Sequence, residues 1–409
     1  MKKLIFFVGI LLLVSCNSKT KKQNVNDILV AEAIGEYHLL DMDMFVDTII
    51  YIPLETTDSI LLGEIQQLIV ENNKIIVTDG NSCKVFGING SYLYDIGKRG
   101  EGPEEFLLVR SLDFFSSEDK LLIDVYPNKY LLFDFLQKNI STLKRPVIED
   151  EYVFGETVFL SSDYFLSDRL SYTKISDKVL LWGSKSGETS DFLLFSNEQS
   201  YEKTLSSYSS FEVSKMFRYE NKLRFYKELN DTIFSVDKDK SISPAYTFKL
   251  GKYKITPDLF LSRDHSKLPT KVWPLNLLES KEYLFIEFSF NNYAPEPFDF
   301  IQKYETGHEV TKTNTNVFSV FNKETGELKL MKQPIKRKQG FKNNIDEGLV
   351  FWPSYISSND EMITFCNSYE FLEHFENVKD VPPHISELIN RIEQDSNPIV
   401  IVAKLKEMQ

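Results

Sequence analysis

A glycine-rich segment near residue 100 is the first place where residue types and spacing suggest chemistry. The segment GKRGEGPEEF (97–106) holds three glycines, and Lys98 and Arg99 stand between the first two. The backbone N–H groups of such a loop can hold a phosphate, but a phosphate loop continues into a helix with Lys followed by Ser or Thr. Here Arg99 follows Lys98, and a strand pattern follows the loop. We therefore expect a structural corner, and we keep Arg99 and Glu105 as candidate ligand-binding residues.

Other patterns typical of enzymes are weak. The five histidines show no metal-ligand spacing; they are His38, His265, His308, His374 and His384. No G-x-S-x-G nucleophile elbow occurs. Neighbouring carboxylates, which glycosidases use in pairs, occur at 41–43, 104–105 and 149–151, but an acidic protein carries such groups on solvated faces. The sequence therefore names no catalytic residue, no metal ligand and no cofactor.

Two Trp-Pro segments are the most ligand-like stretches. GLVFWPSY (348–355) contains Trp352 and Tyr355, and KVWPLN (271–276) contains Trp273. Rigid aromatic surfaces with polar edges suit stacking on a sugar ring or contact with a peptide. Packing between neighbouring sheets is the alternative use of these rings. We take Trp273, Trp352 and Tyr355 as candidate ligand-binding residues.

The N-terminus predicts export and a lipid anchor. Two lysines precede an apolar run, residues 4–15, which is too short to span a bilayer as a mature helix. The run ends in LVSC, which resembles the lipobox of bacterial lipoproteins, where the cysteine becomes lipidated. We therefore expect residues 1–15 to be a signal peptide and Cys16 to be the lipidated residue.

The residues after Cys16 predict a flexible tether and the location of the protein in the cell envelope. Residues 16–36 begin with a polar, charged stretch that has no apolar period, so we expect a flexible tether. Membrane attachment is then through the lipid anchor only. Asn17 stands where Asp would signal retention in the inner membrane, which favours the outer membrane. The basic tether favours the periplasmic side over the cell surface.

The net charge of the chain limits the classes of partner that it can bind. The chain holds 47 basic and 60 acidic residues, a net charge of −13. Such a chain repels phosphates, so we exclude nucleic acid as a partner.

Beyond the anchor only Cys83 and Cys366 remain. An oxidising periplasm permits a disulfide between them, and two separately buried thiols are the simpler alternative.

A pattern of short apolar strands and polar turns recurs six times. Its copies begin at Lys74, Lys120, Lys178, Lys222, Glu282 and Glu361. The shorter steps hold four antiparallel strands, which is one propeller blade. The longest step contains a polar insertion, 291–316, which we expect to be a mobile loop. We predict an all-β fold, a six-bladed β-propeller over residues 37–379. A β-sandwich or two stacked barrels is the rival, but neither needs a six-fold recurrence.

The C-terminal region predicts the closure of the ring. PPHISELIN (382–390) has a helical apolar period after two prolines, and PIVIVAKLK (398–406) reads as a strand. A propeller must hide its first and last edges. We therefore expect residues 380–409 to form a short helix and a strand that complete the propeller. Either 398–406 or 49–55 would join the sheet at the opposite end of the chain.

The chain resembles the six-bladed β-propeller lipoproteins of Bacteroidetes, which are related in shape to NHL-repeat propellers. The resemblance is carried by IPLETTDSILLGEIQQLIV (52–70), DIGKRGEGPEEF (95–106), ELNDTIFSV (228–236), GLVFWPSYISSNDEMI (348–363) and DSNPIVIVAKLK (395–406). It implies the propeller fold and an envelope location, but no reaction, since the family has no assigned activity. It also implies that 97–106 links two blades and that Phe106 packs between them.

Two functions fit these observations. The first is a lipid-anchored, non-catalytic binding or scaffold module for a saccharide, a peptide or an envelope protein. The second is a propeller hydrolase or lyase that acts on glycans through axial carboxylates, with or without a divalent metal. Acids or histidines from several blades that converge on one funnel would favour the second. We predict the first, because catalytic motifs are missing from the sequence.

Overall fold

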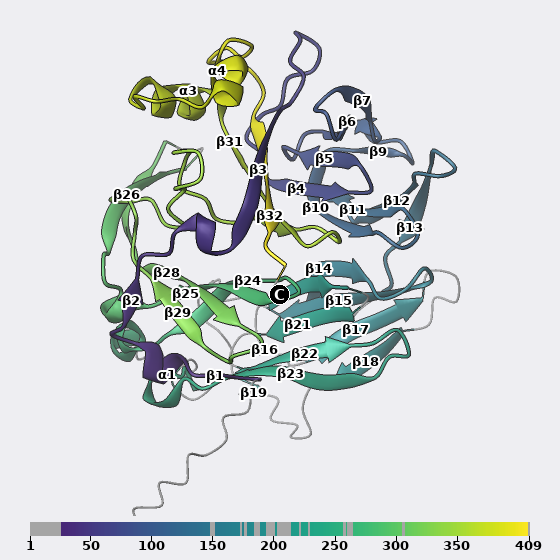
Figure 1. Ribbon diagram of the computed structural model, residues 1–409. Coiled ribbons are helices and arrows are strands. Elements are labelled where there is room, and N and C mark those ends of the chain that lie inside the picture. Colours follow the sequence, from purple (N-terminus) through teal and green to yellow (C-terminus); the bar gives the residue numbers. More distant parts are fainter. Residues whose placement is uncertain are drawn as a thin grey trace, which may run out of the picture.

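The protein is a six-bladed β-propeller with few helices, as the six-fold strand pattern predicts (Figure 1). The computed structural model describes residues 26–147, 152–171, 174–175, 178–183, 189–193, 201–202, 214–220, 222–227, 230–256, 259, 265–304 and 307–407. The six inner strands contact one another in cyclic order, and this contact closes the ring around the axis.

Each blade is an antiparallel sheet of four strands, ordered from the inner to the outer strand. Blades 1 to 3 consist of β4 (Gln67–Glu71), β5 (Lys74–Thr78), β6 (Cys83–Gly87), β7 (Tyr92–Asp95); β10 (Leu108–Phe115), β11 (Lys120–Tyr126), β12 (Lys129–Asp134), β13 (Asn139–Lys144); and β14 (Tyr152–Phe159), β15 (Tyr164–Ser171), β17 (Lys178–Gly183), β18 (Thr189–Leu193). Blades 4 to 6 consist of β20 (Ser214–Tyr219), β21 (Lys222–Lys227), β22 (Thr232–Val236), β23 (Ile242–Phe248); β24 (Trp273–Glu279), β25 (Tyr283–Ser289), β28 (Asn316–Asn322), β29 (Leu328–Met331); and β30 (Tyr355–Ile356), β31 (Glu361–Cys366), β32 (Ile399–Leu405), β3 (Val46–Pro53).

Strands from both ends of the chain close blade 6. β3 pairs antiparallel with β32, with Ile50 opposite Val402. The two strands come from the two segments that the sequence predicts for closure, so this prediction is confirmed. Closure removes the free edges that an open ring would leave at its first and last strands.

The residues before β3 run along the outer edges of two blades. β1 (Asp27–Ile28) pairs in parallel with β23 of blade 4, and β2 (Tyr37–His38) pairs in parallel with β29 of blade 5. Between them lies the short helix α1 (Val30–Ala33), with Val30 fully buried. Residues 27–36 therefore pack on the propeller, whereas the sequence places them in the tether.

The third copy of the repeat is shifted by one strand. Lys178 begins β17, the third strand of blade 3, whereas the other copies begin with the second strand of a blade. The second strand of blade 3 is β15. It buries the apolar side chains of Phe165 and Leu166, and it also buries the acidic side chain of Asp168. The acidic residue interrupts the apolar pattern, because it pairs with Lys227 of blade 4 at 2.7 Å.

The insertion in blade 5 is a β-hairpin, so the prediction of a mobile loop is wrong. β26 (Phe298–Lys303) pairs antiparallel with β27 (Glu309–Asn314), with Phe300 opposite Lys312. Alternating residues such as those in FDFIQK and TKTNTN favour strands, although most of these side chains are exposed. A short 3-10 helix, η4 (Asn291–Tyr293), precedes the hairpin.

Two helices separate β31 from β32 (yellow in Figure 1). α4 (Pro383–Ile389) is the predicted helix, with Ile385 and Leu388 buried. α3 (Ser368–Glu376) was not predicted, although its signal is present. Glu370 stands three residues after Asn367 and accepts a hydrogen bond from its backbone N–H, as in a capping box.

The remaining described elements are short and lie outside the six sheets. They are β8 (Lys98–Arg99), β9 (Glu105–Phe106), β16 (Lys174–Ile175), β19 (Tyr201–Glu202), η1 (Met42–Met44), η2 (Gly251–Tyr253) and η3 (His265–Thr270). Cys83 and Cys366 are both free and buried, Cys83 in the core between blades 1 and 2 and Cys366 beside the helices. The alternative of a disulfide between them is therefore wrong.

Candidate functional site

The glycine-rich segment is a corner between blades 1 and 2, as predicted. β8 and β9 pair in parallel, and the segment connects β7 to β10. Phe106 is 1% exposed and packs in the core that these two blades share. The Glu105 carboxylate accepts a hydrogen bond from the Gly102 N–H at 2.9 Å and pairs with Lys98 at 3.1 Å. A carboxylate of the protein itself thus occupies the loop where a phosphate would bind.

Glu105 is held in the corner, and Arg99 points outward. The hydrogen bond from Gly102 and the nearby Lys98 lower the pKa of Glu105. A Cβ on Gly100 would lie 2.1 Å from a carboxylate oxygen of Glu105, so the glycine leaves the space that this side chain fills. Arg99 is exposed, and its side chain forms no hydrogen bond or ion pair with any described residue.

The aromatic candidates pack inside and between blades. Trp352 stacks on Phe318 and Phe341, with ring centroids 4.4 and 5.5 Å apart, and belongs to the core around the closing blade. Tyr355 donates a hydrogen bond from its hydroxyl to Glu71 of blade 1 at 2.8 Å. Trp273 is half-buried at the start of the inner strand β24. The Trp352 ring is thus part of the core packing, and Tyr355 forms a contact between blades.

Acidic groups on the inner strands are paired with neighbouring blades. Asp113 of blade 2 binds Arg218 of blade 4 at 2.8 Å, across the inner strand of blade 3. Glu156 lies in a β-bulge of β14 and accepts a hydrogen bond from the Met216 N–H at 3.0 Å. Burial raises the pKa of Glu156 to about 7, and Lys215 partly offsets this effect. These contacts hold the inner strands together.

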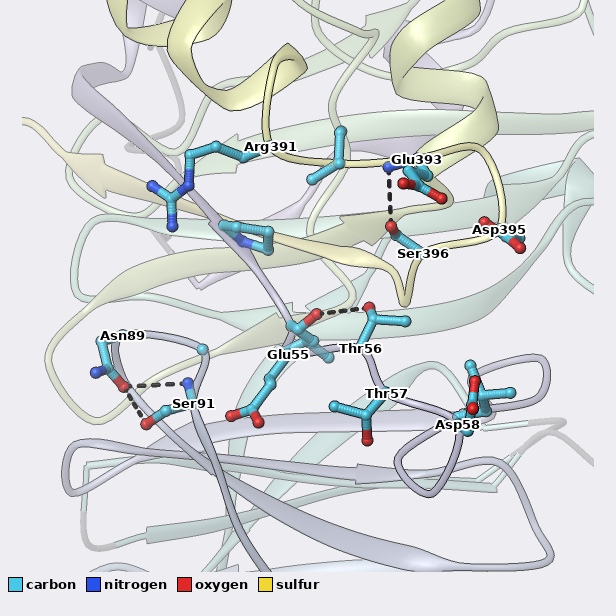
Figure 2. Close-up of a pocket in the computed structure, with 15 residues that line it drawn as sticks. Glu55, Thr56, Thr57, Asp58, Asn89, Ser91, Arg391, Glu393, Asp395 and Ser396 are labelled. Atoms are coloured by element: carbon cyan, nitrogen blue, oxygen red, sulfur yellow. Dashed lines mark hydrogen bonds between the residues drawn. The ribbon is translucent and has the colours of Figure 1, made fainter.

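A groove of about 610 Å³ lies at the seam between blades 6 and 1, and we call it the seam groove (Figure 2). Three segments that are distant in sequence form it. The lining residues are Pro53, Leu54, Glu55, Thr56, Thr57, Asp58, Leu61, Asn89, Gly90, Ser91, Arg391, Ile392, Glu393, Asp395 and Ser396.

A tight turn forms one wall of the seam groove. The Asn89-Gly90 sequence predicts a hairpin with a two-residue turn there, and the structure has a hairpin between β6 and β7. Only Gly90 has a positive φ, +83°, and the Gly90 N–H donates to the Gly87 carbonyl, so a three-residue loop replaces the expected two-residue turn. A Cβ on Gly90 would lie 2.1 Å from the Pro53 carbonyl oxygen, so only glycine allows this close approach.

Asn397 fixes the opposite walls. Its side chain is 3% exposed and donates to the carbonyl oxygens of Glu55 and Ile60, while its amide oxygen accepts from the Leu62 N–H at 2.9 Å. This one side chain therefore ties the loop after β3 to the end of the helical connection. The Glu55 carboxylate in turn accepts a hydrogen bond from the Tyr92 N–H at 2.8 Å.

The seam groove is polar and mostly acidic. Four carboxylates and one guanidinium line it together with Asn, Ser and Thr side chains, and none of the described lining residues is aromatic. It includes none of Arg99, Glu105, Trp273, Trp352 and Tyr355. Nowhere in the described residues do three or more His, Cys, Asp or Glu side chains lie close enough together to hold a metal ion.

The fold and this groove define a six-bladed β-propeller with a polar cleft at its closing seam. The sequence profile of a domain of unknown function, DUF4934, matches residues 25–404, and the chain belongs to this family. The predicted resemblance to a six-bladed β-propeller family of Bacteroidetes is thereby confirmed. A comparison with curated proteins finds no match.

Solved structures show the same fold at low sequence identity. A predicted exported protein from Bacteroides fragilis has a TM-score of 0.66 at 17% identity, and the match covers 91% of this chain and 98% of that one. A DUF4221 member from Bacteroides vulgatus scores 0.48 at 12% identity, covering 88% and 97%. A virginiamycin B lyase from Staphylococcus aureus scores 0.35 at 11% identity, covering 71% and 89%. The first match supports the fold, and the other two are too distant to carry an argument. In the described part of the chain, no helix is long and apolar enough to cross a membrane.

Proposed function

We propose that this protein is an exported, lipid-anchored binding module of the outer membrane and that the seam groove holds its ligand. The observation that carries the proposal is the groove itself. It has the volume of a small-molecule or peptide site, and hydrogen-bonding groups from three segments converge in it. A fold alone does not decide function, so the proposal rests on this site.

The walls of the groove are built to keep their shape. Asn397 and Gly90 fix the positions of the three lining segments through side-chain hydrogen bonds and a close backbone contact. A preformed site loses less entropy when a ligand binds than a site that must first become ordered. The ligand is polar, since hydroxyl, amide and charged groups dominate the lining.

The location follows from the N-terminal sequence. In this proposal residues 1–15 are removed, Cys16 carries the lipid, and the tether ends where β1 begins at Asp27. The propeller then lies on the periplasmic side of the outer membrane. The likeness to a predicted exported protein of Bacteroides fragilis supports export from the cytoplasm and says nothing of the anchor.

Thermal unfolding with a ligand panel tests the site. The panel contains neutral and acidic oligosaccharides and short peptides, each tested against the wild type and a Ser91→Trp variant whose indole fills the groove. The matched control is Ser241→Trp. Ser241 occupies the corresponding turn of blade 4 and hydrogen-bonds Asp239 as Ser91 hydrogen-bonds Asn89, with 2.7 Å between the side-chain oxygens in both pairs.

We expect at least one ligand class to stabilise the wild type and the Ser241→Trp variant, but not the Ser91→Trp variant. A ligand at a hundred times its dissociation constant adds about 2.7 kcal/mol. A stabilisation that survives in the Ser91→Trp variant would place the ligand elsewhere. Turnover of a stabilising glycan would instead support the hydrolase or lyase alternative.

A further inference from the structure

The seam groove carries opposite charges at its two ends. In Figure 2 the Arg391 guanidinium lies at one end, while Asp58, Glu393 and Asp395 gather toward the other. All four side chains are exposed. None of them forms a hydrogen bond or an ion pair with a described side chain, so their charges are available to a ligand. The Glu55 carboxylate, by contrast, already accepts a hydrogen bond from the Tyr92 N–H.

The stretch between the two ends suits a peptide backbone. Thr57 and Ser91 offer hydroxyl groups, and Leu61 and Ile392 offer apolar surface, with Leu61 55% exposed. A peptide presents N–H and C=O groups along its length and a side chain at each residue, so it needs both kinds of contact. A sugar ring would gain most from an aromatic surface, which the described lining does not supply.

We infer that the seam groove binds a short peptide with two free ends, with its carboxylate at Arg391 and its ammonium group at the opposite end, which carries Asp58, Glu393 and Asp395. This inference rests on the proposed function, which places the ligand in this groove. Arginine can hold a terminal carboxylate through two parallel hydrogen bonds. The three carboxylates attract the ammonium group, and the charge pattern selects one direction of the peptide.

Calorimetric titration of the full-length chain in mild detergent tests the inference. The probes are alanine peptides of increasing length in three forms: both ends free, N-acetylated, and C-amidated. Low ionic strength keeps exposed charge pairs from being screened. Each exposed pair is worth a change in affinity of about two- to fivefold, so blocking one end should weaken binding by that factor.

Variants assign each end of the peptide to one end of the groove. Arg391→Gln should weaken the binding of free and acetylated peptides about two- to fivefold and leave the amidated peptide unchanged. The double variant Glu393→Gln, Asp395→Asn should weaken free and amidated peptides and leave the acetylated peptide unchanged. The controls are Lys379→Gln and Glu373→Gln, which remove exposed charges on or near α3, outside the groove lining.

The outcomes separate the inference from the proposed function. The inference is overturned if the affinity for the peptides does not change when an end is blocked or when the groove residues are replaced. If no alanine peptide binds, but an oligosaccharide stabilises the protein in a manner that Ser91→Trp abolishes, the inference is wrong and the proposed function stands. If no ligand depends on Ser91, both are wrong.

Discussion

Arg224 of blade 4 and Glu279 of blade 5 form an ion pair inside the protein, with 2.7 Å between Nε and Oε2 and side chains that are 8% and 0% exposed. The Tyr246 hydroxyl and the Lys323 ammonium group each donate a further hydrogen bond to Glu279, both at 2.9 Å. Every partner of this buried carboxylate is a donor, so the network fastens two neighbouring blades.

Removal of the acidic partner should destabilise the protein strongly. Glu279→Gln leaves the Arg224 guanidinium buried without its counter-charge, and loss of one partner from a buried pair costs about 3–5 kcal/mol. Urea unfolding measures the change. Lys303→Gln is the control, because its pair with Glu309 is 74% and 50% exposed and should contribute less than about 1 kcal/mol. Equal effects of the two variants would contradict this account of the interface.

The turn at Gly90 should be more sensitive to a methyl group than a similar turn elsewhere. In Gly90→Ala the new Cβ meets the Pro53 carbonyl oxygen, in addition to the strain of a positive φ. Gly307→Ala is the control, since its φ of +79° is similar but no atom lies within 4 Å of the new Cβ. We expect a loss of about 1 kcal/mol for the control and at least about twice that for Gly90→Ala in urea unfolding. Equal losses would show that the contact with blade 6 has no effect.

Glu156 should make stability depend on pH. Its pKa is about 7 in the folded protein against an ordinary value of 4.5, because burial disfavours the charged form and Asp113 and Asp168 add repulsion. The folded state therefore binds more protons than the unfolded state between these values. Its contribution to stability is then present below the lower pKa and is lost as the pH rises toward 7.

The Glu156→Gln variant isolates this effect. From pH 4.5 to pH 8 the wild type should lose about 2–3 kcal/mol relative to the variant, as unfolding at a series of pH values would show. The amide can still accept the hydrogen bond from the Met216 N–H. Parallel stability curves for the two proteins would mean that Glu156 titrates at an ordinary pKa.

The anchor should depend on one thiol. We expect the wild-type protein to fractionate with the outer membrane and to carry a lipid mass on Cys16. Cys16→Ser should release the protein into a soluble fraction, because the proposed attachment is through lipid alone. Cys83→Ser is a control for the removal of a thiol, since that thiol is buried in the propeller core. Membrane association of the Cys16→Ser protein would contradict the anchor.

The blades were predictable because each strand is encoded locally. The run IIVT in β5 and the run LLIDV in β11 are buried at consecutive positions in the blade, and the repetition of such runs gives the number of blades. The prediction failed for β15, where the buried Asp168 forms an ion pair with Lys227 of the next blade. A tertiary contact of this kind leaves no periodic signal in the sequence.

The seam groove was not predictable in the same way. Its residues come from 53–61, 89–91 and 391–396, and tertiary contacts bring these segments together, namely the pairing of β3 with β32, the close approach of Gly90 to Pro53 and the hydrogen bonds of Asn397. The Asn-Gly turn was recognisable as a hairpin, but nothing nearby marks it as the wall of a site. Among the aromatic candidates, Trp352 stacks on Phe318 and packs against the core, and its residue type alone does not distinguish a binding surface from core packing.

The most direct test of the groove as the binding site is hydrogen–deuterium exchange with and without the alanine peptide that binds most tightly. The account predicts slower exchange in 54–61, 89–91 and 391–396 and no change in 348–355. Slower exchange around Trp352 and Tyr355, with no change in the three groove segments, would contradict it.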